Sequence, residues 1–190
     1  RSPDSLTTVY KTRLGRQVRD GGGISPDITA KGLKLNRLLY TLQLEGWDID
    51  FANLYLSKHP TCDNPQYFEV TDTVFQEFKD FIIPSGFKYD KAYTELFKAL
   101  REGLKQEDYL TENVDNQISA LETALHRNLA EDLELNREGL NYILADAIAP
   151  RYGFRRAAIA SNLRYNEALQ KAIEIITNSS EYKNILSNQL

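Results

Sequence analysis

Residues 35–55 read LNRLLYTLQLEGWDIDFANLY, and this stretch decides the fold class. Its first apolar residues recur at the i, i+3, i+4, i+7 spacing of one helix face: Leu35, Leu38, Leu39 and Leu42. Phe51, Leu54 and Tyr55 continue the period in a second helix. We expect that helix to end before Pro60, because proline cannot donate a backbone hydrogen bond. The stretch predicts two consecutive amphipathic helices.

The same helical period continues toward the end of the chain. The further helices that it predicts cover residues 74–82, 93–104, 118–133 (a long fifth helix), 140–148, 165–176 and 182–186. Thr71 or Asp72 would cap the third helix, and residues 84–86 would stop it. Pro150 should kink or end the sixth helix, and Ser180 would cap the last. No repeat of fixed period is present, which disfavours a solenoid.

The N-terminal residues have a different pattern. Residues 8–12 and 17–19 are rich in β-formers and predict two short strands, with Gly15-Arg16 as the turn between them. We therefore predict a mainly α fold, in which a short N-terminal β-hairpin and extended segment is followed by a multi-helix bundle. The expected domains are residues 1–30 and an all-helical region, 31–190. A lone hairpin is marginally stable in water, so we expect its partner strands to lie outside this chain.

The composition is that of an ordinary globular protein, with 42% hydrophobic and 26% charged residues. The net charge is −4, and no dense basic stripe of the kind that binds nucleic acid is present. A single cysteine, Cys62, excludes an internal disulfide, and we find neither an apolar run of membrane-spanning length nor a signal peptide. The chain contains no methionine, so we expect Arg1 to mark a cut that removed upstream sequence.

Residues 10–28 read YKTRLGRQVRDGGGISPDI. This stretch resembles a segment of the carboxyl-terminal processing proteases, in which a strand, a Gly-Arg turn and a Gly-Ile-x-Pro-Asp element lie just downstream of the catalytic lysine. The form with three glycines is similar to that of Bacteroidetes-type members. Residues 3–6 also fit that subfamily, as do parts of the helical tail at 51–52, 59–60 and 182–186.

The resemblance implies a structural motif beside the protease core, made of Gly15, Arg16, Gly21, Gly22, Gly23, Pro26 and Asp27. Glycines let the backbone turn sharply, proline fixes one dihedral, and an aspartate can accept hydrogen bonds from nearby backbone groups. A tight loop between a hairpin and a helix in an unrelated protein could use glycine, proline and aspartate for the same reasons. Two residues depart from the subfamily: Arg19, where an aromatic residue is more common, and Pro150, inside an expected continuous helix.

The resemblance also implies what the parent protein does. Family members are serine endopeptidases that cleave near the C-termini of proteins, with a Ser nucleophile and a Lys general base. Burial keeps such a lysine neutral by lowering its pKa, and the free amine then takes the serine proton. A PDZ-like domain would hold the substrate tail. All these parts lie upstream in the family, so we expect no catalytic residue and no cofactor in this chain.

The expected partners are the upstream protease and PDZ-like domains of the same parent and its protein substrates, with a homo-oligomer as a further option and no nucleic acid. Because the family is usually exported, the periplasm or cell envelope is the expected location. The alternative is a free-standing helical interaction module without protease ancestry, since each helix after residue 30 is explained by a core face and a solvated face.

Several other residues are of types found in catalytic, metal-binding or phosphate-binding sites, but their neighbours in the sequence do not fit such a site. Ser119 lies within an amphipathic helix, whereas a nucleophile needs an exposed turn and an adjacent base. His59 and Cys62 could form half of a metal site, but His126 is the sole further strong ligand candidate, and a structural zinc site needs four. The three glycines lack the Gly-Lys-Ser/Thr ending of a phosphate-binding loop. We expect Trp47 to be a core residue rather than a ligand platform.

Overall fold

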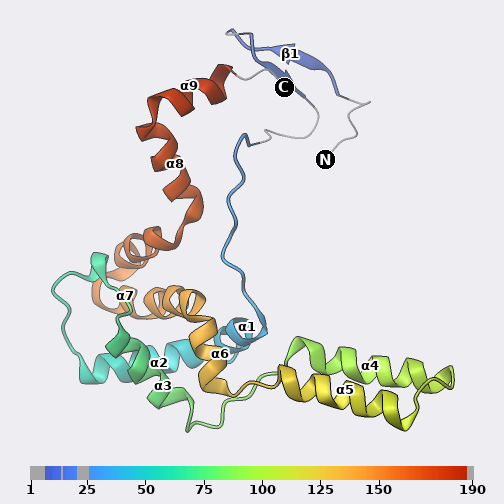
Figure 1. Ribbon diagram of the computed structural model, residues 1–190. Helices are drawn as coiled ribbons and strands as arrows, with labels where there is room; N and C mark the ends of the chain where they lie inside the picture. The colour runs from blue at the N-terminus through green and yellow to red at the C-terminus, as the bar shows by residue number, and fades with distance from the viewer. Residues whose placement is uncertain (1–6, 14, 21–25, 188–190) are drawn as a thin grey trace. The chain divides into compact units, whose positions relative to one another are not determined.

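The computed structural model describes residues 7–13, 15–20 and 26–187 (Figure 1). Within these ranges the chain forms nine α-helices and a single two-stranded antiparallel sheet, which confirms the predicted mainly α fold. The elements are β1 (Val9–Lys11), β2 (Gln17–Arg19), α1 (Arg37–Leu44), α2 (Trp47–Lys58), the 3-10 turn η2 (Pro65–Tyr67), α3 (Asp72–Ile82), α4 (Ala92–Gln106), α5 (Glu112–Leu125), α6 (Leu129–Leu135), α7 (Arg137–Asn162), the 3-10 turn η3 (Leu163–Tyr165), α8 (Glu167–Thr177) and α9 (Ser179–Ser187).

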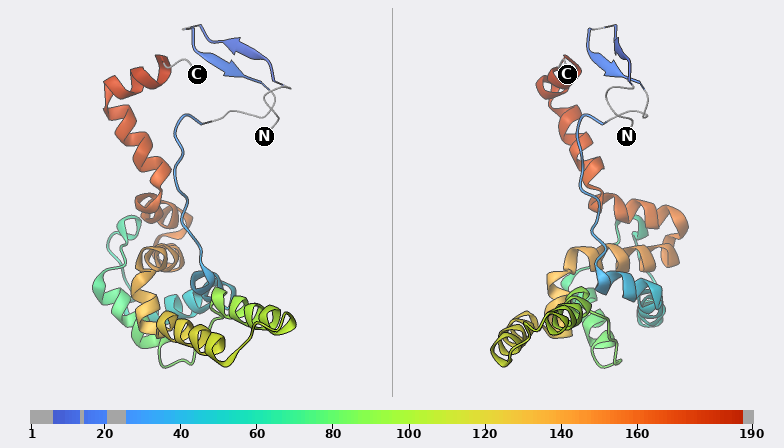
Figure 2. Two further views of the ribbon diagram at one scale, coloured as in Figure 1. Left: turned by 45° about the vertical axis from the view of Figure 1, so that its right-hand side comes forward. Right: turned by 90° about the vertical axis from the view of Figure 1, so that its right-hand side faces the viewer.

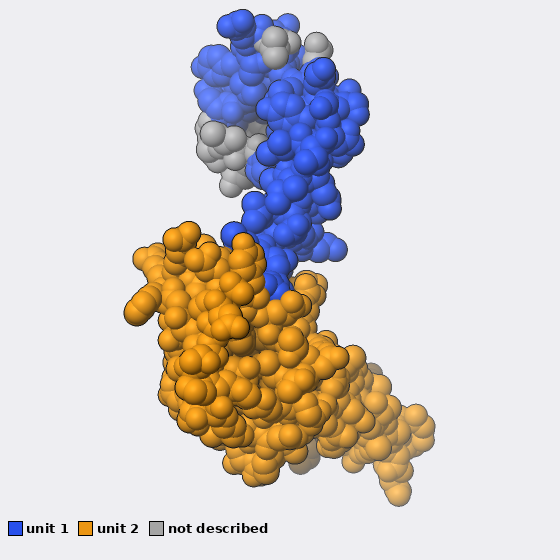
Figure 3. Space-filling view, turned by 90° about the vertical axis from the view of Figure 1, so that its left-hand side faces the viewer, with its two compact units in different colours: residues 1–33, 163–190 blue, residues 34–162 orange. Residues whose placement is uncertain are grey.

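The chain divides into two compact units, coloured separately in Figure 3. Unit 1 contains residues 1–33 and 163–190, and unit 2 contains residues 34–162. The domain boundary expected after residue 30 stays a prediction. None of the helices in the described part of the chain combines the length and the apolar content that crossing a bilayer requires.

The strands of unit 1 form a tight hairpin. Val9 pairs with Arg19 and Lys11 with Gln17. The turn is closed by a hydrogen bond from the Thr12 N–H to the Arg16 carbonyl, and Gly15 has a φ of +85°, which glycine adopts without steric cost.

The core of unit 2 is built from α1, α2, α3 and α7. Phe51 of α2 packs edge-to-face on Phe78 of α3, with ring centroids 5.2 Å apart. Apolar residues of α1 and α7 complete this core, with side chains at most 1% exposed: Leu38, Leu39, Leu42, Leu140, Ile143, Leu144 and Ile148. Trp47, expected in the core, makes edge contacts with the rings of Phe81 and Phe87.

Helix α7 does not break where the sequence predicted. It continues through Pro150, and its backbone leaves helical geometry at Gly153 and Phe154 instead. The expected kink or end at Pro150 is therefore wrong. A β-carbon at Gly153 would lie 2.8 Å from the β-carbon of Pro65, so the packing of η2 against α7 requires glycine there. The bend lies at this close contact, which the sequence around Pro150 does not encode.

The predicted long helix over residues 118–133 is two helices. Helix α5 ends at Leu125, and Asn128 caps α6. Two carbonyls of the intervening turn are taken by side chains: Tyr93 donates to the Leu125 carbonyl at 3.0 Å, and Lys91 donates to the Arg127 carbonyl at 2.6 Å. The leucine period continued across the turn, but these contacts replace the helical hydrogen bonds there.

The predicted caps have mixed outcomes. Thr71 caps α3, as one of the two expected alternatives, through a hydrogen bond from the Val74 N–H. Ser180 lies inside α9 rather than before it, and the side chain of Asn178 accepts from the Glu181 N–H in the capping position. Asparagine is a strong cap because its short amide reaches backbone donors of the first turn.

Phe154 has a φ of +56° and a ψ of −162°, a combination that is populated almost solely by glycine, and its side chain is 84% exposed. We expect Phe154→Gly to raise the free energy of unfolding by about 1 kcal/mol, since it removes backbone strain and little packing. Urea denaturation followed by circular dichroism would measure the change.

Phe154→Ala is the matched control, because alanine also lacks the ring but keeps the strain at positive φ. It should show no such gain. Equal stability of Phe154→Gly and the unsubstituted chain would contradict the strain at this position.

Candidate functional site

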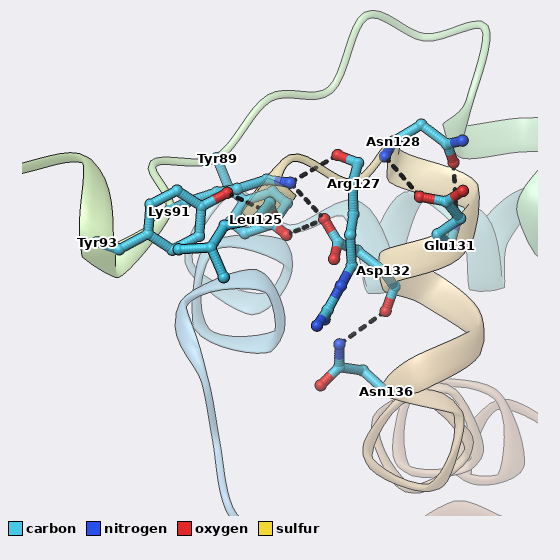
Figure 4. Close-up of polar contacts among 9 residues, drawn as sticks. All are labelled: Tyr89, Lys91, Tyr93, Leu125, Arg127, Asn128, Glu131, Asp132 and Asn136. Carbon is cyan, nitrogen blue, oxygen red and sulfur yellow. Dashed lines mark hydrogen bonds and ion pairs between the residues drawn. The ribbon is translucent and has the colours of Figure 1, made fainter. Parts of the chain in front are cut away.

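A polar network gathers where the helical hairpin of α4 and α5 joins α6 (Figure 4). We call Tyr89, Lys91, Arg127 and Asp132 the hinge network. The Tyr89 hydroxyl donates to Asp132 Oδ2 at 2.6 Å, and Lys91 Nζ lies 2.9 Å from the same oxygen. Lys91 also donates to the Arg127 carbonyl. One carboxylate thus contacts the segment that enters the hairpin, and its lysine partner contacts the segment that leaves it.

Local structure places Asp132 at this point. A capping box begins α6: the Glu131 N–H donates to Asn128 Oδ1 at 2.9 Å, and the Asn128 N–H donates to Glu131 Oε2 at 3.1 Å. Asp132 therefore lies in the first turn, where the helix dipole favours a negative charge. Asn136 donates to the Asp132 carbonyl at 2.7 Å. The carboxylate side chain is only 9% exposed, so its hydrogen bonds are shielded from water.

The hinge network holds Tyr89 in its neutral form. Burial raises the pKa of Tyr89 first, and the hydrogen bond to Asp132 raises it further, because ionised tyrosine could no longer donate. Tyr89 and Lys91 therefore share one buried carboxylate. Because Lys91 also donates to the Arg127 carbonyl, the network connects the segments at both ends of the α4–α5 hairpin.

The hairpin itself is locked along one side by Arg101 of α4. Its guanidinium donates to Asp115 at 2.7 Å, Glu122 at 2.8 Å and Ser119 at 3.1 Å, all on α5. The pKa of Glu122 is lowered, chiefly by its hydrogen bond with Arg101. Phe97 is a buried side chain of α4, and Ile118 is a buried side chain of α5.

The motif predicted next to the protease core is described in part. Arg16 and Asp27 form a two-contact ion pair that joins the hairpin turn to the Pro26-Asp27 element, with Nη1 3.1 Å from Oδ2. The hydrogen bond to Asp27 is the main cause that raises the pKa of Arg16. Gly21, Gly22 and Gly23 lie outside the described residues, as do residues 3–6. The structural role of this motif stays a prediction.

The other candidates have ordinary surroundings. Ser119 lies in the middle of α5 and accepts a hydrogen bond from Arg101, a cation that cannot serve as a base. His59 Nε2 lies 3.2 Å from both carboxylate oxygens of Glu77, and its ring packs on Tyr55. Cys62 is a free, half-buried thiol. Within the described ranges no three His, Cys, Asp or Glu side chains are grouped so that they could hold a metal ion.

Sequence reasoning missed the hinge network. Its residues are scattered over two segments, and no motif joins Tyr89 to Asp132 before the chain is folded. One signal was available: Asn128 followed by Glu131 has the spacing of a capping box, which marks a helix start within the predicted fifth helix.

Removal of the shared carboxylate should loosen the hairpin. We expect Asp132→Ala to lower the free energy of unfolding by about 3 kcal/mol, because Tyr89 and Lys91 lose their acceptor in a shielded position. Hydrogen exchange should speed up selectively in α4, α5 and α6.

Glu95→Ala is the matched control. It removes an exposed ion pair with Lys98 on α4 and should leave stability nearly unchanged. Unchanged hairpin exchange in Asp132→Ala would contradict the mechanical role of the hinge network.

The raised pKa of Tyr89 predicts that the free energy of unfolding depends on pH. Its pKa is higher in the folded chain than in the unfolded chain, so its contribution is complete below about pH 10 and is lost as pH rises beyond that value. We expect the stability of the natural chain to fall more steeply above pH 10 than that of Tyr89→Phe. Urea denaturation at matched pH values compares the two slopes, and parallel curves would exclude a contribution from Tyr89.

The chain was compared with known proteins. A family model described as "Probable PDZ-protease, C-terminal helical domain" matches residues 38–176, a range that runs from α1 into α8. No curated protein matches the chain, and no solved structure does.

The family match covers most of the chain and includes the hinge network and the whole of unit 2 except its first residues. It agrees with the expectation of a protease-associated, helical, non-catalytic region that accompanies other domains of the same protein. The chain belongs to the family of C-terminal helical domains of probable PDZ-proteases.

Proposed function

We propose that this chain is the non-catalytic C-terminal region of a serine-type, tail-specific peptidase with a Ser/Lys dyad, of the Bacteroidetes type of carboxyl-terminal processing protease. The family match carries the protease association. The finer assignment is supported by residues 10–28, whose order of turn, glycines and Pro-Asp resembles that subfamily. The catalytic serine and lysine, the PDZ-like domain and the substrate-binding edge belong to the upstream part of the parent protein, which acts in the periplasm or cell envelope.

The role of the chain in that parent is support and assembly. Unit 1 combines the N-terminal segment with the C-terminal helices: the Lys31 N–H donates to Glu167 at 2.9 Å, and Lys171 donates to the Thr29 carbonyl at 3.2 Å. Glu167 also pairs with Lys171, which is the main cause that lowers the Glu167 pKa. Helix α8 therefore holds the segment that follows the predicted protease motif through these hydrogen bonds. Unit 2 would make the contacts with protein partners, substrates of the parent or further copies.

An alternative is a free-standing interaction module. The observation that favours it is the apolar core of unit 2, to which α1, α2, α3 and α7 all contribute fully buried side chains. In that case residues 31–190 would fold alone and bind a protein partner, residues 1–30 would serve only as a leader, and the Arg16–Asp27 pair would have no consequence for any peptidase.

The test uses the complete parent protein and cleavage of an unfolded protein substrate. One variant replaces residues 34–162 by a short Gly/Ser linker, and a second carries Arg16→Gln. We expect the first to keep peptide-bond cleavage, because unit 2 contributes no catalytic group. The second should lose at least about tenfold in activity, because the ion pair positions the motif beside the core.

Two control variants accompany the test. Arg13→Gln changes a charge near the same turn without the Asp27 pair and should retain activity. Substitution of the upstream serine by alanine should abolish cleavage. A parent that cleaves nothing would overturn the peptidase assignment, and loss of cleavage in a folded protein without residues 34–162 would overturn the expectation that cleavage does not depend on unit 2.

A further inference from the structure

Helix α7 folds back on itself at Gly153 and Phe154, and both views of Figure 2 show its two halves next to each other. Asn162, at the end of the helix, donates to Asp146 Oδ1 at 2.7 Å, although the two residues are 16 positions apart. In a straight helix they would be about 24 Å apart. The residues after the bend therefore form a separate helical stretch with an exposed side of its own.

The exposed side of this stretch combines apolar and basic side chains. Phe154 is 84% exposed, Ile159 is 55% exposed, and Arg155 and Arg156 are exposed as well. At about 100° per residue, Ile159 projects between the two arginines, because it follows one by four positions and the other by three. Ala157 points to the opposite side and is fully buried. We call Phe154, Arg155, Arg156 and Ile159 the elbow surface.

The two arginines of the elbow surface lack the carboxylate partners that other cations of unit 2 have. Arg101, for comparison, contacts two carboxylates of α5. In the part of the chain that the structure describes, neither Arg155 nor Arg156 forms an ion pair, a hydrogen bond or a ring contact. Residues 147–166 contain four arginines and no aspartate or glutamate, although the net charge of the whole chain is −4. The elbow surface is therefore a local basic site on an acidic protein.

The backbone holds the Phe154 ring in solvent against its own conformational preference. Its φ of +56° strains any residue other than glycine, and strain of this kind is concentrated at functional sites. Burial does not compensate for the strain, because the side chain is largely exposed. Strain and exposure at one position together favour a ring that is presented to a binding partner.

We propose that the elbow surface binds an acidic segment of another protein, whose carboxylates pair with Arg155 and Arg156 and whose apolar side chains pack on Phe154 and Ile159. Charge complementarity selects this occupant. The planar guanidinium matches a carboxylate with two parallel hydrogen bonds and is weakly hydrated, so it keeps such a contact next to apolar groups.

The size of the elbow surface argues against other anionic partners. Recognition of an anionic lipid surface uses clusters of about four to eight basic residues, and a nucleic-acid site uses a longer basic stripe. Two arginines beside two apolar side chains suit a short peptide segment instead. Because the contact is smaller than a standard protein interface, we expect a dissociation constant on the order of tens of micromolar.

The inference rests on the proposed role of unit 2 in contacts with protein partners and deepens it by naming the surface and the chemistry of the partner. Fluorescence anisotropy tests it with the full chain and a labelled synthetic peptide in which glutamates flank one leucine and one phenylalanine. The natural chain should bind this peptide saturably at low salt, about 0.05 M. The same peptide with lysine for glutamate, or with glycine for both apolar residues, should bind at least about tenfold more weakly.

The double variant Arg155→Gln/Arg156→Gln should weaken binding of the glutamate peptide at least about tenfold, because both charge-assisted contacts are lost. Lys88→Gln/Lys105→Gln is the matched control, since it removes two exposed charges elsewhere in unit 2 and should bind like the natural chain. Arg155→Glu/Arg156→Glu should reverse the preference and select the lysine peptide.

Phe154→Gly separates binding from folding. It is expected to stabilise the fold, and it should nevertheless weaken binding of the glutamate peptide at least about fivefold, because the apolar contact of the ring is lost. Structural damage cannot explain a variant that is more stable and binds less. Unchanged binding by Phe154→Gly would overturn the role of the ring.

Absence of saturable binding to the natural chain, or equal weakening by the Lys88→Gln/Lys105→Gln control, would overturn the inference. Tighter binding to vesicles of mixed phosphatidylcholine and phosphatidylserine than to the glutamate peptide would also overturn it and would identify a membrane surface as the occupant. The peptide assay requires no peptidase activity, and the cleavage assay on the parent without residues 34–162 requires no elbow surface, so the two proposals fail separately.

Discussion

Helix α7 packs closely against α1 and η2 at two positions that carry no side chain, Gly139 and Gly153. A β-carbon at Gly139 would lie 2.4 Å from a methyl group of Leu39, and one at Gly153 would overlap Pro65. At Gly139 the contact is with the end of a flexible leucine side chain, which can rotate, whereas the Pro65 ring at Gly153 cannot move aside without its backbone. The arrangement of η2 against α7 therefore depends on the close approach at Gly153.

The cost of this packing lies next to the second glycine. Gly153 has a negative φ of −136°, whereas Phe154 takes a positive φ that glycine would adopt without strain. The glycine therefore stands where the neighbouring Pro65 leaves no room for a side chain, and the backbone strain falls on the next residue, Phe154. Burial of the Phe154 ring contributes little stability, since the side chain is largely exposed.

Polar contacts hold the α4–α5 hairpin at its ends and along one side. Asp132 and Lys91 connect the segments that enter and leave it, and Arg101 of α4 bonds with Asp115 and Glu122 of α5. A segment held in this way loses little conformational entropy when it supports a neighbouring domain.

Local chemistry was sufficient for much of the fold. The β-hairpin, its Gly15-Arg16 turn, the Thr71 cap and the approximate positions of most helices followed from propensity, capping and apolar period, because these signals act between residues that are near one another in sequence. The family resemblance of residues 10–28 was equally local. It pointed to the protease association that the family match supports, and Arg16 and Asp27 of that motif pair in the structure.

The sequence by itself thus determined that this protein is a mainly α chain with a small N-terminal hairpin, whereas tertiary structure decided where its helices break. The period of Leu121, Leu125 and Leu129 is continuous, but side chains from residues 91 and 93 take the carbonyls that a continuous helix needs. Pro150 is tolerated, and the bend lies at Gly153, because a distant turn packs there. Contacts between residues remote in sequence have no periodic signature, so the hinge network exists only in the folded chain.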